Sequence, residues 1–219
     1  MIRPLIAKNS LNPLFYEKTK DGEQMYDISS RLVKDRRIFL NCEIDDDVAS
    51  TIVSLIYLLD KENKKEKINI WINSPGGCLE GLLAIYDIMN YVEAPICTVC
   101  MSQAASAAAV ILAAGTPGMR YVMPNSEVMI HQIQTGFDGS TPQIETKTKE
   151  LKRRQNVLNE ILARHTGQTI AKIKRDTTND KFMTAQEAVD YGLADNIWQP
   201  KKKIPELKGP KNNKNKLPC

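Results

Sequence analysis

The sequence predicts a single α/β domain in which strands and helices alternate along the chain. Runs of apolar residues of strand length alternate with apolar residues at helical spacing, which is typical of parallel β-α-β crossovers. The chain has 219 residues, enough for one domain with an appendage but short for two full domains. Its 42% hydrophobic and 26% charged residues are ordinary for a globular protein. The longest run of low polarity, over 104–114, is about half of the ~20 residues that a membrane-spanning helix needs.

The N-terminal half opens without a clear pattern and then becomes regular. Residues 1–24 mix Pro, Asn, Lys and Gly without periodicity, so we expect an irregular or mobile arm. A short helix over 26–34 and a strand over 37–40 follow. Apolar residues at i, i+4, i+7 and i+8 predict a helix over 48–59. The acidic triplet at 45–47 resembles part of a calcium loop, but carboxylates at a helix N-terminus explain it without an ion.

The middle of the chain contains two strand-to-helix junctions. The strand expected over 68–72 ends in the Pro-Gly-Gly loop of 73–77, and a helix over 79–92 comes next. The strand expected over 96–101 runs through small residues into a helix over 106–114.

The last third begins with an apolar strand over 128–131. Pro142 suits the first turn of a helix, and apolar residues at helical spacing extend that helix over 141–164. The sequence of 184–187 is a capping box, and the helix that it opens is expected to stop at Gly192.

The net charge of +4 comes from the end of the chain. Of 30 basic and 26 acidic residues, seven lysines and one glutamate lie in 200–219, which leaves 23 basic and 25 acidic residues before it. We therefore expect a basic disordered tail on a body that binds neither nucleic acid nor membrane.

The cysteines favour neither a disulfide framework nor a metal site. Their number is odd, five, and the N-terminus carries no secretory apolar segment, so a reducing compartment is expected. Cys97 and Cys100 form a C-x-x-C, but they lie in an expected strand that would point them to opposite faces. No second pair completes a zinc site.

Ser106 and His131 are the residues that suggest chemistry. Ser106 lies at a strand-to-helix junction among alanines, where a nucleophile on a tight turn needs small neighbours. His131 ends a strand and is the better candidate base, since His165 lies at a helix C-terminus, where a cation or a C-cap explains it. Each residue also has an ordinary structural interpretation: Ser106 as a helix N-cap and His131 as a core histidine.

Several separated motifs resemble the ClpP family, the proteolytic subunits of Clp proteases. These motifs occur in family order over 72–77, 86–89, 103–106, 124–132, 165–168, 175–177 and 187–195. The resemblance covers about residues 13–199. It implies a ClpP/crotonase-like α/β fold of stacked β-β-α units with a protruding long handle helix.

The resemblance implies a catalytic triad of Ser106 as nucleophile, His131 as general base and Asp180 as the orienting carboxylate. Asp176 and Asp195 lie near enough in the sequence to be rivals of Asp180. The oxyanion donors would be the backbone N–H groups of Gly77 and Ala107.

Four positions depart from the family pattern. Ser102 replaces a usual Gly and Ala107 a usual Met, neither of which removes a catalytic group. Ile133 replaces the usual Pro after His-Gln, which is expected to alter the strand where substrate lies. Asn179 replaces an Arg that in many members joins the two rings, which puts the ring-to-ring switch in doubt.

The implied function is ATP-dependent proteolysis inside a chamber. Heptameric rings, made of this chain alone or mixed with a paralogue, would stack as a tetradecamer, and a Clp-family ATPase would feed unfolded polypeptides to it. ATP would be used by that partner, so this chain is expected to need no cofactor. The partner is expected to dock on Trp71, Tyr91, Met101 and Trp198, for which ordinary core is the rival interpretation.

The resemblance also implies that the chain has three parts. Residues 1–12 are expected to be an N-terminal extension or propeptide, 13–199 the protease domain, and 200–219 the tail. Within the domain, 13–25 would form an axial arm and about 133–164 the handle region. A cytoplasmic location is expected, with plastid stroma or mitochondrial matrix as alternatives. A non-catalytic ring subunit and a crotonase-like acyl-CoA enzyme remain the other classes.

Overall fold

The computed structural model describes residues 14–19 and 22–199. The expected extension over 1–12 and the tail over 200–219 lie outside the described residues. Within the described part, no helix is both long and apolar enough to cross a membrane.

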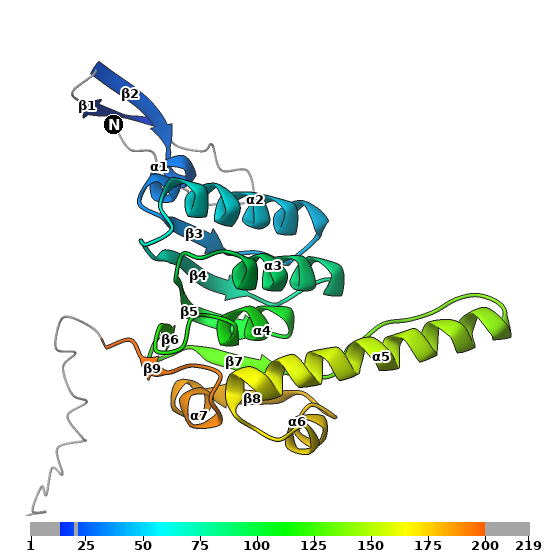
Figure 1. The fold of residues 1–219 in the computed structure, drawn as a ribbon. Helices are drawn as coiled ribbons and strands as arrows, with labels where there is room; N and C mark the ends of the chain where they lie inside the picture. Colours follow the sequence, from blue (N-terminus) through cyan, green and yellow to red (C-terminus); the bar gives the residue numbers. More distant parts are fainter. Residues whose placement is uncertain (1–13, 20–21, 200–219) are drawn as a thin grey trace, which may run out of the picture.

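A seven-stranded, mostly parallel sheet forms the centre of the molecule (Figure 1). Neighbouring strands lie in the order β3 (Arg37–Leu40), β4 (Ile68–Ser74), β5 (Ile96–Ala105), β6 (Arg120–Val122) and β9 (Asn196–Ile197). The second half of β5 pairs in parallel with β7 (Glu127–Ile130), and β8 (Lys181–Thr184) pairs antiparallel with β7. Parallel strands joined through helices confirm the predicted α/β class.

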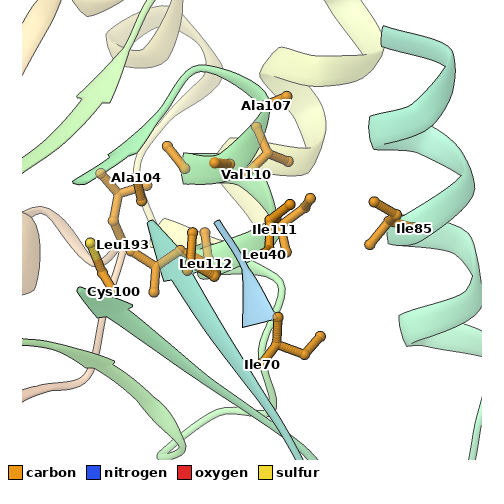
Figure 2. Packing of buried hydrophobic residues seen from close by; sticks show 14 of the residues in the cluster. Leu40, Ile70, Ile85, Cys100, Ala104, Ala107, Val110, Ile111, Leu112 and Leu193 are labelled. Carbon is orange, nitrogen blue, oxygen red and sulfur yellow. The ribbon is translucent and has the colours of Figure 1, made fainter. Parts of the chain in front are cut away.

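Three helices pack along the sheet: α2 (Asp46–Glu62), α3 (Leu79–Tyr91) and α4 (Ala107–Ala113). The carboxylate of Asp45 accepts a hydrogen bond from Val48 N at 2.8 Å, so the acidic triplet caps a helix as expected. All seven residues of α4 are buried, and Figure 2 shows its side chains in the core. Since α4 begins directly after Ser106, the hydrophobic core fixes the position of that residue.

The long helix α5 (Thr141–Thr166) has 26 residues and projects from the body (Figure 1). It opens with a capping box from Ser140 and ends at Gly167 in the left-handed conformation. Its fully buried residues all lie at or beyond Asn159, so its first half carries little of the core. Two short helices complete the fold, α6 (Ile170–Asp176) and α7 (Ala185–Tyr191).

The expectation of an irregular or mobile arm over 1–24 was wrong for the part of it that the structure describes, residues 14–19 and 22–24. An antiparallel hairpin of β1 (Leu14–Thr19) and β2 (Gly22–Asp27) leads into helix α1 (Ile28–Lys34). Leu14, Tyr16 and Met25 are exposed. None of the hairpin side chains whose burial the structure describes is buried, and without a buried face no apolar alternation signals a strand here.

Strand β5 extends four residues beyond the predicted end at Met101. Ser102 bends it with a φ of 66°, and the strand then leaves β6 and pairs with β7. The sequence does not signal this continuation, because a polar Ser-Gln pair inside a strand resembles a turn.

Candidate active site

Ser106 lies in a strained turn between β5 and α4. Its φ of 55° and ψ of −120° are unfavourable for a residue with a Cβ, and such strain is concentrated at functional sites. It occupies the N-cap position, yet its side chain makes no capping hydrogen bond. Its Oγ lies 2.8 Å from Nε2 of His131. The N-cap interpretation of this side chain is therefore wrong.

His131 follows the last residue of β7, and its side chain is only 15% exposed. One ring nitrogen faces Ser106, and the other, Nδ1, lies 3.3 Å from Oδ1 of Asp180. Nδ1 is buried and makes no hydrogen bond of normal geometry with any described residue. Catalytic hydrogen bonds are often poorly aligned without substrate and tighten in the reacting complex, so the short distance is the relevant feature.

The two rival aspartates are engaged elsewhere. Asp176 pairs with Lys172 and accepts a hydrogen bond from the Tyr191 hydroxyl at 3.0 Å. Asp195 binds Arg120 through both carboxylate oxygens. Of the three aspartates, the structure brings only Asp180 to the imidazole of His131.

His165 is remote from this group and is not the expected helix-terminal cation. Its Nε2 lies 3.0 Å from the Tyr86 hydroxyl. Burial, together with the positive charges of Arg120 and Arg164, lowers the pKa of His165 and favours the neutral ring. The helix ends at Gly167 instead.

The loop of Gly76 and Gly77 packs against the Ser106 turn. Gly76 has a φ of 98°, and a Cβ there would lie 2.7 Å from Cβ of Ser106. Ile44 holds the loop from the other side, because its N–H donates to Gly76 O and its carbonyl accepts from Cys78 N, both at 2.7 Å. Among the described residues, neither Gly77 N–H nor Ala107 N–H has an acceptor. Two free donors therefore line the same pocket as Ser106 and His131.

A cavity of about 680 Å³ opens beside Ser106 and extends to α5. Its apolar wall includes Leu82, Val110, Ile130, Leu158 and Leu162, and both Ile133 and Gln155 also line the cavity. The same cavity carries two carboxylates, Glu80 and Glu150. Both pair with Arg154, and hydrogen bonds from Arg153 and Arg154 lower the pKa of Glu150 to about 2. These ionised, paired carboxylates are poor candidates for acid–base catalysis.

The structure brings the two tryptophans together, and among the described residues Tyr91 makes no aromatic ring contact with either of them. The centroids of Trp71 and Trp198 are 5.6 Å apart, and both side chains are partly exposed. Phe39 stacks on Trp71 at 5.9 Å, and Tyr121 meets Trp198 edge-on at 5.0 Å.

Sequence reasoning missed Phe39 and Tyr121 in this aromatic surface, which we define as Phe39, Trp71, Tyr121 and Trp198. The signal for Phe39 was its position between the buried Ile38 and Leu40, which points it to the opposite face of the sheet. Met101 is partly buried, and Tyr91 is 73% exposed.

The C-x-x-C cysteines are buried in β5. Burial raises the pKa of the Cys100 thiol to about 11, so this side chain stays protonated at neutral pH. In the described part of the chain, no group of three or more His, Cys, Asp or Glu residues is placed to hold a metal ion.

One comparison with known proteins bears on this site. The sequence profile of the Clp protease family matches residues 20–201, which include every residue of the site described above.

Proposed function

The chain belongs to the Clp protease family, and from this membership we propose that it is the proteolytic subunit of an ATP-dependent Clp protease. The proposed activity is that of a serine endopeptidase that cleaves unfolded polypeptides to short peptides. The observation that carries the proposal is the 2.8 Å separation of Ser106 Oγ and His131 Nε2 at a strained turn.

The proposed reaction is acyl transfer in two stages. His131 accepts the Ser106 proton at Nε2 while Oγ attacks the peptide carbonyl. The protonated ring then donates this proton to the leaving amine, and an acyl-enzyme remains. In the second stage His131 takes a proton from water while the water oxygen attacks the ester. The imidazolium then returns the proton to Ser106 Oγ as the bond from Oγ to the acyl carbon breaks and the peptide acid leaves. Asp180 would hold the ring through Nδ1 and stabilise its cationic form.

The negative charge that develops on the carbonyl oxygen needs fixed donors. The unengaged N–H groups of Gly77 and Ala107 support this role, since both line the cavity beside Ser106. Preorganised donors of this kind contribute about 10²–10³-fold each in serine proteases. The apolar wall of the cavity is suited to an apolar side chain of the substrate.

The proposed assembly is a pair of heptameric rings, in which a closed chamber restricts cleavage to threaded chains. The projecting first half of α5 offers a surface for contact between rings. The aromatic surface supports docking of a Clp-family ATPase, because aromatic anchors in pockets commonly dominate interface energies. That ATPase, and not this chain, would consume ATP.

The direct test combines labelling with cleavage. A fluorophosphonate should label the purified protein at Ser106, and a fluorogenic peptide should be hydrolysed by the assembled species seen by native mass spectrometry. Ser106→Ala should lose labelling and hydrolysis while keeping the native mass. An assembled protein that is neither labelled nor active would be a non-catalytic ring subunit. Thioester turnover without peptide cleavage would instead indicate an acyl-CoA enzyme.

A further inference from the structure

We propose that Gln155, on the long helix α5, is a positioning residue for the catalytic base His131. The inference rests on the proposed function, since it concerns the reaction assigned to Ser106 and His131. Gln155 touches neither of these side chains in any described hydrogen bond. It acts on the backbone two residues beyond His131.

The segment that carries His131 has no strand ladder beyond Ile130. Strand β7 ends there, and residues 131–139 have no regular secondary structure. On one side, Gln132 holds the segment to the end of α6: its N–H donates to Thr177 O at 2.8 Å and its side chain to Thr178 O at 3.2 Å. This first attachment ties the base to the turn that leads to Asp180.

The opposite side of the segment is held by α5. The N–H of Ile133 donates to Oε1 of Gln155 at 2.7 Å. The other end of the Gln155 amide, Nε2, donates to Oδ1 of Asn159 at 3.0 Å. Asn159 is 2% exposed, so its side chain lies within the body of the protein. The chain of bonds thus runs from a buried anchor to the backbone beside the base.

The chemistry of the two contacts fixes the orientation of the Gln155 amide. A flipped amide would place its NH₂ group against the Ile133 N–H and its oxygen against Oδ1 of Asn159, which loses both bonds. The attachment also depends on the residue at position 133, because a proline there would have no N–H to donate. Ile133 and Gln155 therefore form a matched pair in this chain.

Holding the segment from both sides matters because proton transfer depends on sub-ångström placement. The imidazole must keep its 2.8 Å contact with Ser106 Oγ and stay beside Asp180. Small displacements of a catalytic group can cost up to about 10²-fold in rate. Removing one of two attachments should cost less, about tenfold in kcat, with little change in KM.

The test uses four single variants at positions 133, 155 and 156, one double variant and Ser106→Ala, each made in the full chain and assayed as the assembled protein. Gln155→Met keeps the length of the side chain but removes the acceptor. Gln155→Glu keeps an acceptor for Ile133, and the Asn159 amide can turn to donate Nδ2 to it. Ile133→Pro removes the donor. The control is Asn156→Ala. Asn156 is an exposed neighbour on the same helix, and its side chain makes no hydrogen bond to the described residues.

Three measurements are made on each variant: kcat and KM for a fluorogenic peptide, the rate of fluorophosphonate labelling, and native mass. Gln155→Met is expected to lower kcat and the labelling rate about tenfold, with KM and native mass unchanged. Gln155→Glu should restore most of both rates. Ile133→Pro should reproduce the loss, and the double variant Ile133→Pro/Gln155→Met should lose nothing more, because the two residues form one contact.

Several outcomes overturn the inference. Rates for Gln155→Met equal to those of Asn156→Ala would show that the attachment does not position the base. A rise in KM alone would make Gln155 a substrate contact, and loss of the assembled mass would make it structural. Additive losses in the double variant would show that Ile133 and Gln155 act independently and do not form one contact. Ser106→Ala, assayed in parallel, tests the proposed function separately from the role of Gln155. If this variant still cleaves the peptide and is still labelled, the proposed function itself is wrong.

Discussion

Gly76 packs directly against Ser106, so the glycine-rich loop and the serine turn form one structural unit. A Cβ on Gly76 would lie 2.7 Å from Cβ of Ser106 and 2.6 Å from the carbonyl oxygen of Ala105. Both distances are far below van der Waals contact, and both atoms belong to the turn that positions the nucleophile. Neither the turn nor the loop can move alone without changing the spacing between Ser106 Oγ and the Gly77 N–H.

Gly76→Ala should therefore reduce peptide hydrolysis by at least 10²-fold, because the turn must shift to admit the methyl group. Gly118→Ala is a matched control: Gly118 has a φ of 84°, but a Cβ there meets nothing within 4 Å. The control carries similar backbone strain without the clash, and it should keep near-normal kcat. Equal activity losses in the two variants would show that strain, and not contact with Ser106, is responsible.

Asp180→Asn should lower kcat by about 10⁴-fold if the serine-protease precedent for the orienting aspartate applies here. The amide can present its NH₂ group to Nδ1 and favour the wrong tautomer of His131. Asp176→Asn is the matched comparison, since Asp176 binds Lys172 and Tyr191 rather than the imidazole. Steady-state kinetics on both variants check this, and a larger loss for Asp176→Asn would reverse the assignment.

Ser102→Gly should stabilise the protein by roughly 0.5–1 kcal/mol. Ser102 is exposed and has a φ of 66°, a conformation that costs a residue with a Cβ about 1–2 kcal/mol. Glycine removes that cost, although it adds entropy to the unfolded chain. Ser50→Gly, at an exposed position within α2, should destabilise by a similar amount. Chemical denaturation of both variants measures these changes in the free energy of unfolding. Destabilisation by Ser102→Gly would mean that the Ser102 hydroxyl has a structural role.

The central strands and helices could be predicted because burial dictates their sequence pattern. In β4, Ile68, Ile70 and Ile72 are buried and alternate with partly exposed residues, which is the pattern from which the strand was inferred. The turn at Ser106 was predicted from its small neighbours, and the left-handed conformation supplies the physical reason for them. The strands β6, β8 and β9 have four residues or fewer and carry no comparable pattern.

The aspartate that orients His131 could not be identified from the residues alone. Asp176, Asp180 and Asp195 are distinguished by the side chains that they contact, which are Tyr191, His131 and Arg120 from other segments of the chain. The resemblance to a family pointed to Asp180. No pattern in the sequence connects Ile133 to Gln155, because their contact depends on how α5 packs beside the segment after β7.

Loss of the Asp195 carboxylate should destabilise the protein strongly near pH 7 and much less in acid. Burial alone raises the pKa of Asp195, but hydrogen bonds from the side chain and backbone of Arg120 outweigh it and leave the pKa below its ordinary value of 3.8. A lowered folded-state pKa contributes stability that is present above the unfolded pKa and is lost as the pH falls through the folded pKa.

Asp195→Asn should therefore cost about 3–5 kcal/mol at pH 7, because it leaves the buried Arg120 without the carboxylate that balances its charge. The difference from wild type should shrink below about pH 4. Urea unfolding at both pH values, at one protein concentration, measures this. Asp35→Asn is the control, since Asp35 pairs with Arg31 at an exposed site, where an ion pair contributes little. A difference that is constant with pH would show that folding does not change the pKa of Asp195.

Trp198→Ser should weaken ATPase-dependent degradation of a folded protein while sparing cleavage of small peptides by the ring alone. Trp198 joins Trp71 and Tyr121 in the aromatic surface, and removing its indole takes away a partly exposed anchor of the kind that dominates interfaces. Tyr57→Ser, at an exposed aromatic residue on α2 that lies outside this surface, should leave both activities unchanged. The readouts are degradation of a folded substrate with the ATPase, hydrolysis of a fluorogenic peptide without it, and native mass. If Trp198→Ser loses both activities together with the assembled species, the indole belongs to the core and the docking assignment is wrong.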